Sequence, residues 1–189
     1  MPRIVGGAAG GRRIVVPAGR GTRPTSDRTR EALFSAVESL VDLDGAHVLD
    51  LYAGSGAVGL EAVSRGAAHA FLVESDRGAL AVLRRNAAEL GLPGVQVATG
   101  AVERFAAADP PATAAAPYHL VFADPPYALG AADLADVLTG LAGHGWLAPD
   151  AVVVVERATR DADWVWPAPL APVRARRYGE ATLWYGRAS

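Results

Sequence analysis

"LDLYAGSGAVGLEAV", residues 49–63, decides how this chain folds. An apolar run of strand character leads into Gly54, Gly56 and Gly59, and a helical pattern follows. Glycines between a strand and a helix let the backbone approach a bound molecule closely. The stretch therefore predicts a strand, a glycine-rich turn and a helix that together form part of a ligand site.

The rest of the chain repeats this alternation. Strand-like runs at 69–75, 95–101, 119–124 and 152–158 alternate with helical patterns at 57–66, 77–91, 102–108 and 131–142. Strands this apolar are typical of a parallel sheet that helices cover on both faces. Residues 172–186 differ, because two alternating runs around Gly179 and Glu180 predict an antiparallel hairpin at one edge. The prediction is an α/β, Rossmann-like fold with a mostly parallel, seven-stranded sheet.

The composition limits the class of protein. The chain has 189 residues, of which 51% are hydrophobic and 20% charged, as suits one domain with a sizeable core. No apolar run is long enough to span a membrane, and "MPRIVGGAAGG" lacks the apolar region of a secretory signal. There is no cysteine, and the four histidines lie far apart without metal-ligand spacing. We expect a cytoplasmic protein with no membrane contact and no metal.

Charge is distributed unevenly. Residues 1–30 hold seven arginines and one acid, whereas residues 31–169 hold seven arginines and 18 acids. A basic arm on an acidic body indicates a polyanionic partner. The β-branched runs Ile4–Val5 and Ile14–Val16, separated by glycines, predict a β-hairpin that is mobile until a partner orders it. We therefore divide the chain into an arm at 1–24 and a domain at 25–189, with Thr25 or Ser26 capping a helix over 27–41.

Two cofactors fit the glycine-rich turn. Glu74 lies at the end of the next strand, where a carboxylate can accept hydrogen bonds from ribose hydroxyls. A nicotinamide dinucleotide would place its pyrophosphate at the helix N-terminus. S-adenosylmethionine carries no phosphate but has an ammonium group, which Asp50 could meet directly or through water. Asp50 favours S-adenosylmethionine, although it could instead cap the helix.

"VFADPPYALG", residues 121–130, suggests the chemistry. An exocyclic amine of a base is a poor nucleophile, and it improves when acceptors hold its N–H groups. Asp124 and the carbonyl of Pro125 are acceptors, the two prolines remove competing donors, and Tyr127 can stack on a base. In an open α/β sheet, ligands bind at this end of the strands. The loop therefore predicts methyl transfer to an amine, although Asp-Pro-Pro could also be a simple strand-ending turn.

With these motifs, the sequence resembles class I S-adenosylmethionine-dependent methyltransferases. More narrowly it resembles the RsmD-type bacterial family, which methylates the N2 amine of one guanine in 16S ribosomal RNA. The resemblance covers essentially the whole chain and rests on "RIVGGAAGGRRIVVP", "TRPTSDRTREALFSAV", "DLYAGSGAVGLEAVSRGA", "FLVESD" and "ADPPY", in that order. It implies 16S ribosomal RNA in the small subunit, or in its assembly intermediate, as the partner. Because the chain is one small domain, we expect a monomer.

The resemblance also implies roles for individual residues. Those expected at the target base are Asp124, Pro125, Pro126 and Tyr127. Those expected at S-adenosylmethionine are Asp50, Tyr52, Ala53, Gly54, Ser55, Gly56, Glu74, Ser75, Ala101, Val102 and Asp124. Ala101 departs from the wider class, in which an Asp or Asn meets the adenine amine, so only backbone groups of Ala101 and Val102 serve there. RNA phosphates are assigned to Arg12, Arg13, Arg20, Arg23, Arg28 and Arg30.

Three rival functions stay open at this point. Another amino-methyltransferase would act on adenine N6 or a glutamine side chain, although a carboxylate such as Asp124 suits the N1–H and N2–H of guanine better. A nicotinamide-dependent oxidoreductase would use the same glycines. A non-catalytic RNA-binding or assembly protein would keep only the fold. Glu156, at the end of "VVVVE", is interpreted as a hydrogen-bonding strand-end residue.

Overall fold

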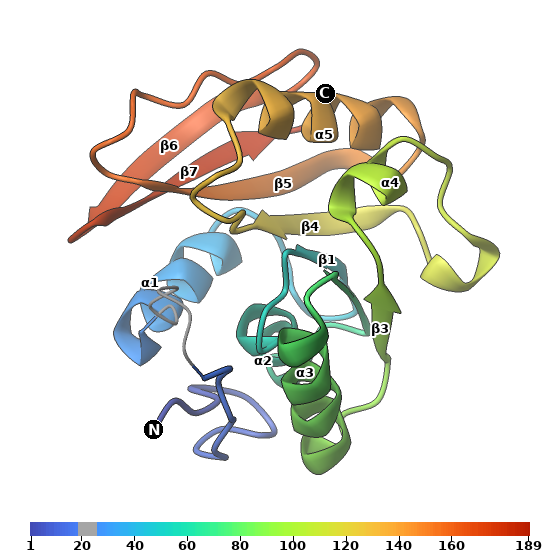
Figure 1. The fold of residues 1–189 in the computed structure, drawn as a ribbon, viewed down its shortest axis with the longest axis vertical. Helices are drawn as coiled ribbons and strands as arrows, with labels where there is room; N and C mark the ends of the chain where they lie inside the picture. The colour runs from blue at the N-terminus through green and yellow to red at the C-terminus, as the bar shows by residue number, and fades with distance from the viewer. Residues whose placement is uncertain (19–25) are drawn as a thin grey trace.

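The computed structural model describes residues 1–18 and 26–189 and contains one seven-stranded sheet (Figure 1). The strands are β1 (His47–Leu51), β2 (His69–Glu74), β3 (Val95–Thr99), β4 (Tyr118–Ala123), β5 (Leu147–Ala158), β6 (Ala171–Tyr178) and β7 (Ala181–Arg187). Their order across the sheet is β3-β2-β1-β4-β5-β7-β6. The first five strands are parallel, and β7 pairs antiparallel with both β5 and β6. The predicted mostly parallel sheet with an antiparallel hairpin at one edge is confirmed.

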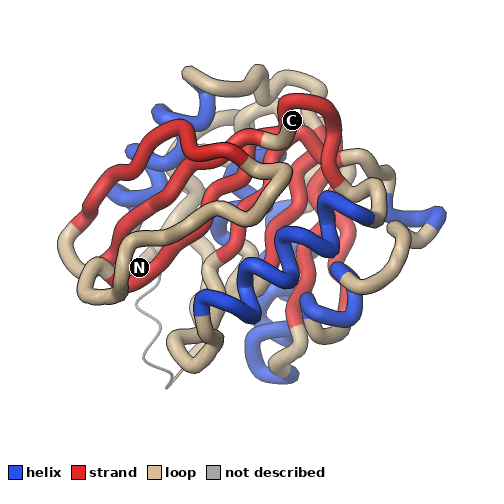
Figure 2. Tube along the Cα trace, turned by 90° about the horizontal axis from the view of Figure 1, so that it is seen from above, coloured by secondary structure: helices blue, strands red, loops and turns tan. Residues whose placement is uncertain are grey.

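Helices cover both faces of this sheet (Figure 2). They are α1 (Asp27–Glu38), α2 (Ala57–Ser64), α3 (Arg77–Leu90), α4 (Val102–Ala106) and α5 (Ala131–Gly143), with a short 3₁₀ helix, η1 (Ala112–Ala114), before β4. Apolar residues of α1, α2 and α3 fill one core, and those of α4 and α5 fill the other. Successive side chains of a strand alternate between these two cores, which explains the apolar strand sequences. Within the described residues, no helix is long and apolar enough to cross a membrane.

Local sequence signals set the ends of the helices. The Ser26 hydroxyl accepts a hydrogen bond from the Thr29 amide at 3.1 Å and so caps α1. Asp76 caps α3 in the same way, and Gly91 ends that helix in the left-handed region at φ 60°. Strand β5 begins at Leu147, five residues before the apolar run that predicted it.

Residues 1–18 are packed on the domain, which corrects the prediction of a separate, mobile arm. The chain doubles back here with one antiparallel bridge, between Arg3 and Arg13, instead of a regular hairpin ladder. Ile4 and Ile14 are fully buried in the core formed with α1, α2 and α3. Residues 19–25, which include the rest of the predicted arm, lie outside the described residues.

Buried polar groups hold this N-terminal segment in place. Glu61 of α2 accepts hydrogen bonds from the amides of Val5 and Gly6, each at 2.8 Å. Asn86 of α3 exchanges two hydrogen bonds with Val15, donating to its carbonyl at 2.8 Å and accepting from its amide at 2.9 Å. Because these partners are side chains of α2 and α3, the segment is an integral part of the helix-covered face (Figure 1).

Candidate functional site

Four neighbouring parallel strands each carry an acid at or near the C-terminal end. In the order of the sheet these acids are Glu74 (β2), Asp50 (β1), Asp124 (just after β4) and Glu156 (β5). The register places all four side chains on the face that packs against α1, α2 and α3. We refer to these four residues as the acid row. Four carboxyl groups on one edge of a sheet form a site suited to cationic groups and to hydrogen-bond donors.

The glycine-rich turn lies beside the acid row. Gly56 precedes α2 at φ 81°, and a Cβ there would come within 2.2 Å of the Leu83 side chain. A Cβ at Gly59 would lie 3.1 Å from the Asp50 carboxylate. Tyr52 adopts a positive φ of 57°, which is rare for a residue with a side chain. A side chain at position 59 would crowd the Asp50 carboxylate, so glycine is needed there for the backbone of α2 to lie this close to Asp50.

Asp50 is almost completely buried, with 2% of its surface exposed. Its Oδ2 accepts a hydrogen bond from the Gly59 amide, in the first turn of α2, at 2.9 Å. Burial raises the pKa of Asp50 to about 8; the Gly59 hydrogen bond opposes this shift and the charge of Glu74 adds to it. Asp50 therefore does cap the helix, as considered from the sequence. Its carboxyl would ionise if a cation came close to it.

Glu74 joins the turn to the start of α3. One carboxylate oxygen accepts from the Gly54 amide at 2.8 Å, and the other accepts from the amides of Ser75 and Asp76, each at 2.8 Å. These bonds fix the carboxylate at the mouth of the turn. Ribose hydroxyls could add to it, because each carboxylate oxygen accepts more than one hydrogen bond.

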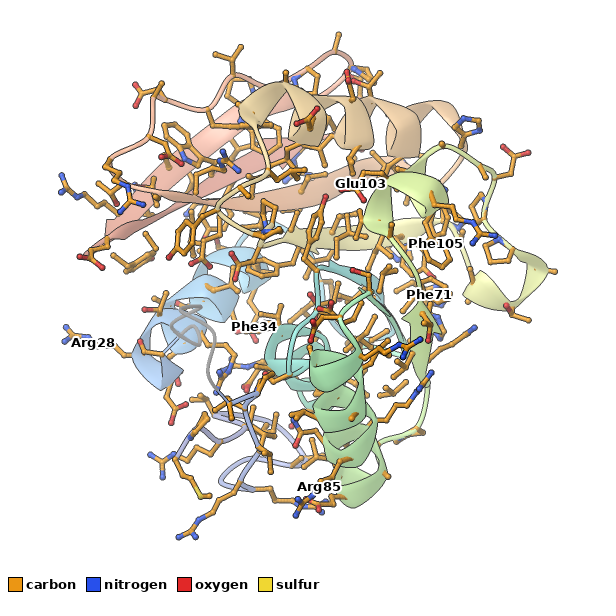
Figure 3. The ribbon with its side chains drawn as sticks, in the orientation of Figure 1. Arg28, Phe34, Phe71, Arg85, Glu103 and Phe105 are labelled. Carbon is orange, nitrogen blue, oxygen red and sulfur yellow. The ribbon has the colours of Figure 1, made fainter. Side chains whose placement is uncertain are left out.

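The remaining residues expected at the cofactor surround this point. Tyr52, Ala53, Gly54, Ser55 and Gly56 form the turn itself, and the Tyr52 hydroxyl reaches α4, where it donates to Glu103 at 3.1 Å (Figure 3 labels Glu103). Ala101 is the N-cap of α4 and Val102 its first residue. Asn86, which sequence reasoning missed, donates to the Ser55 carbonyl at 2.9 Å and so couples the turn to α3.

A pocket opens next to Asp124 at the other end of the acid row. It is bounded by the start of α1, the loop after β4, the end of β5 and the β6–β7 hairpin. Its lining comprises Ser26, Thr29, Asp124, Pro125, Tyr127, Glu156, Arg157, Ala158, Asp161, Tyr178, Glu180 and Ala181. Of the predicted base-binding residues, Asp124, Pro125 and Tyr127 meet there, whereas Pro126 is exposed and outside the lining.

Asp124 and Glu156 act on each other electrostatically. Burial raises the pKa of Asp124 well above its usual range, and the charges of Glu156 and Asp50 raise it further. Two such carboxyls cannot both ionise easily unless a cation or hydrogen-bond donors arrive. A role for Glu156 beside Asp124 is difficult to predict from sequence, because only the pairing of β4 with β5 brings the two residues together.

The loop after β4 is held from β5 and presents its tyrosine outward. Arg157 donates to the Leu129 carbonyl at 3.1 Å, and Leu129 donates to the Pro126 carbonyl at 2.9 Å. The Tyr127 side chain is 67% exposed, and the guanidinium carbon of Arg160 lies 5.8 Å from its ring centroid. An exposed aromatic ring on a fixed loop is available for stacking.

The arginines assigned to RNA divide into several groups. Arg30 is fully buried and pairs with Glu61 at 3.3 Å and with Asp27 at 3.0 Å, so its assignment to RNA phosphates is wrong. Arg12 donates to the Leu90 carbonyl at 2.8 Å, as well as to Glu89, and so caps the end of α3. Arg13 and Arg28 are exposed, and Figure 3 shows Arg28 extending outward from α1. Arg20 and Arg23 lie outside the described residues.

Three histidines that are far apart in the sequence lie close together at the opposite edge of the sheet. The ring centroid of His47 lies 5.7 Å from that of His69 and 5.6 Å from that of His119. These residues sit at the starts of neighbouring parallel strands. Among residues 1–18 and 26–189, no group of three or more potential ligands has the geometry to hold a metal ion.

Comparisons with known proteins extend over nearly the whole chain. The model of the family described as conserved hypothetical protein 95 matches residues 2–187. Ribosomal RNA small subunit methyltransferase D of Escherichia coli strain K12 is 41% identical over 154 residues, 82% of this chain and 73% of that protein. The Haemophilus influenzae protein of the same name is 32% identical over 154 residues, 82% of this chain and 77% of that protein.

Solved structures agree with these sequence matches. The Escherichia coli protein yhhF superposes with a TM-score of 0.83 at 33% identity, covering 99% of this chain and 97% of that one. An RNA methyltransferase from Salinibacter ruber, solved in complex with S-adenosyl-L-homocysteine, has a TM-score of 0.59 at 20% identity. It covers 84% of this chain and 91% of its own, and it shows similarity of fold.

Proposed function

The chain belongs to the conserved hypothetical protein 95 family, the family of RsmD-type methyltransferases, and from this premise we propose that it methylates a guanine of 16S ribosomal RNA. The methyl group comes from S-adenosylmethionine and goes to the exocyclic N2 amine. The observation that carries this assignment is the acid row, which joins a glycine-rich turn to a pocket lined by Asp124, Glu156 and Tyr127. The relatives named ribosomal RNA small subunit methyltransferase D support the substrate.

The turn fits S-adenosylmethionine better than a dinucleotide. Asp50 is a buried carboxyl, and a Cβ at Gly54 would have no atom nearer than the Tyr52 carbonyl oxygen at 3.9 Å, so the mouth of the turn is open to a ligand. A pyrophosphate would bring negative charge against Asp50 and Glu74, which like-charge repulsion disfavours. When bound, the cofactor supplies a methyl group on a positively charged sulfur. Asp50 would hold its ammonium group and Glu74 its ribose hydroxyls.

Asp124 and Glu156 would position the amine. Guanine presents N1–H and two N2–H donors on one edge, and two carboxylates on adjacent strands can accept all three. Those hydrogen bonds orient the nitrogen lone pair toward the methyl group, and Tyr127 stacks on the ring. N2 would lose a proton when it takes up the methyl group that the cofactor supplies, and a carboxylate of this pair would accept that proton. Adenine offers an acceptor at N1, for which this pair has no matching donor when ionised.

The test uses labelled S-adenosylmethionine and small ribosomal subunits from cells that lack the endogenous enzyme. We expect label in N2-methylguanosine, with kcat reduced at least a hundredfold in Asp124→Ala and cofactor affinity retained. Asp136→Asn, which removes an exposed carboxylate on α5, is the matched control. Label in N6-methyladenosine would move the protein to the rival amino-methyltransferase function. Full turnover in Asp124→Ala would refute the role of the loop.

A further inference from the structure

Strand β6 is the outermost strand of the sheet and carries a cluster of arginines. Arg174, Arg176 and Arg177 all lie on it, and Arg176 and Arg177 are exposed. None of the three forms an ion pair with a carboxylate of residues 1–18 or 26–189; they donate hydrogen bonds to hydroxyl and carbonyl oxygens. Their charges are therefore available to an outside partner.

The register of β6 shows on which face of the sheet two of these arginines lie. Arg174 pairs with Tyr185 and Arg176 with Leu183, and both of these β7 residues belong to the core on the face of α1, α2 and α3. Residues opposite each other in an antiparallel pair share a face. Arg174 and Arg176 therefore lie on the same face of the sheet as the acid row.

This row of arginines leads to the base pocket. Arg174 donates to the hydroxyl of Ser39, the C-cap of α1, at 3.2 Å. Two residues beyond Arg176 on the same face is Tyr178, which lines the pocket together with Ser26 at the start of α1. The row thus runs beside α1, from the end of that helix to its beginning, and finishes at the pocket. Neighbours in the row are about 6.6 Å apart, from a rise of about 3.3 Å per residue.

The acidic residues of α1 do not neutralise this row. Glu38 and Glu31 pair with Arg65 at the end of α2, at 3.2 Å and 3.9 Å. On the other side of the pocket, the exposed Arg28 adds further positive charge at the first turn of α1 (Figure 3). In contrast, the charge of Arg30 is neutralised by its buried ion pair with Glu61. Arg160 is also exposed beside the pocket, with its guanidinium carbon 5.8 Å from the ring centroid of Tyr127, so positive charge near the pocket lies on β6, at the start of α1 and at Arg160.

We propose that Arg174 and Arg176 of β6 form a phosphate-binding row that holds the RNA strand leading to the target nucleotide. The inference rests on the proposed function, since it takes RNA as the substrate. Two guanidinium groups on alternate residues of one extended strand suit successive phosphates of an extended RNA backbone. Such contacts position the substrate and carry no sequence information, which leaves recognition of the base to the pocket.

The test compares two double variants of the full chain. Arg174→Ala with Arg176→Ala removes the row, and Arg84→Ala with Arg85→Ala removes the same charge from the exposed face of α3. The probe is the small ribosomal subunit from cells that lack the endogenous enzyme, with binding measured over a range of salt concentrations. S-adenosylmethionine affinity and melting temperature confirm that each variant is folded. A third variant, Arg174→Lys with Arg176→Lys, retains the charge.

We expect the β6 alanine variant to bind subunits at least tenfold more weakly, with a salt slope smaller by about 1.4, or about 0.7 for each lost phosphate contact. The lysine variant should recover most of the affinity, and the α3 variant should bind like the wild type. An unchanged affinity and slope in the β6 variant, or an equal loss in the α3 variant, would overturn the proposal. If β6-dependent binding occurs without N2-methylguanosine, the phosphate row stands and the proposed function fails.

Discussion

Asp50 is expected to release a proton when S-adenosylmethionine binds. In the protein alone, burial raises the pKa of Asp50 to about 8, so its carboxyl is mostly protonated at neutral pH. An ammonium group beside it would favour the carboxylate and return its pKa toward the ordinary value of about 3.9. Binding should therefore release about 0.9 of a proton from Asp50 at pH 7, and correspondingly less as the pH approaches 8.

The same linkage makes cofactor affinity depend on pH. Because the protonated form must ionise first, the Kd for S-adenosylmethionine should fall by about tenfold between pH 6 and pH 7. This range lies below that in which an α-amino group titrates, about 7.7–8.0. In the absence of cofactor the shift opposes folding, because the folded chain keeps the proton up to about pH 8 and the unfolded chain loses it near pH 4. The free energy of unfolding should decrease across that window as pH rises, by about 1.4 kcal/mol per pH unit.

Isothermal titration calorimetry in buffers of different ionisation enthalpy counts the released protons. Asp50→Asn keeps the shape of the side chain and its acceptor for the Gly59 amide, but it has no proton to release. The difference between wild type and Asp50→Asn isolates Asp50 from Asp124, whose pKa is also raised. If the two proteins release the same number of protons, or the wild type releases none, the account of Asp50 as the ammonium partner is refuted.

Two further predictions concern residues that the structure reassigns or exposes. Arg30→Met removes one of the two arginines that pair with the buried Glu61, whose other partner is Arg65 at 2.9 Å, and should cost about 1.5–3 kcal/mol in urea unfolding, whereas an arginine that served only RNA would leave stability unchanged. Tyr127→Ala should lower kcat/KM for small subunits by the equivalent of about 1–3 kcal/mol through lost base stacking, while Tyr127→Phe keeps most of it. Equal kinetics for the two tyrosine variants would show that the ring does not stack on the base.

The fold could be predicted because its signals are local. Period-two and period-3.6 patterns, glycines at the turns and a capping serine each depend on a few neighbouring residues. Except for β5, which begins five residues early, the predicted helices and strands begin at or next to these signals. Asp50, Glu74 and Asp124 could be selected in the same way, since each ends a strand predicted to lie in a parallel sheet.

The features that could not be predicted from the sequence depend on contacts between segments that are distant along the chain. Arg30 lies in the arginine-rich N-terminal stretch, which predicts RNA binding. Only the packing of α1 against α2 shows that Glu61 neutralises Arg30 in the core. Glu156 could not be linked to Asp124 before the order of the strands was known. The docking of Ile4 and Ile14 likewise needs α2 and α3 in place, because the glycine-rich sequence around them favours no single conformation.

The charge layout explains how an acidic site can accept a polyanion. The acid row would repel phosphates, so an RNA backbone is expected to remain at the rim, where Arg28 and the arginines of β6 lie. A guanine base is uncharged and presents N–H donors, so it alone gains by entering the pocket between Asp124 and Glu156. Extrusion of the base from its strand costs a few kcal/mol. It lets the pocket recognise the base while the rim holds the phosphates. The reaction therefore needs positive charge at the rim and negative charge in the pocket. Exchanging the two charges would impair both phosphate binding and guanine binding.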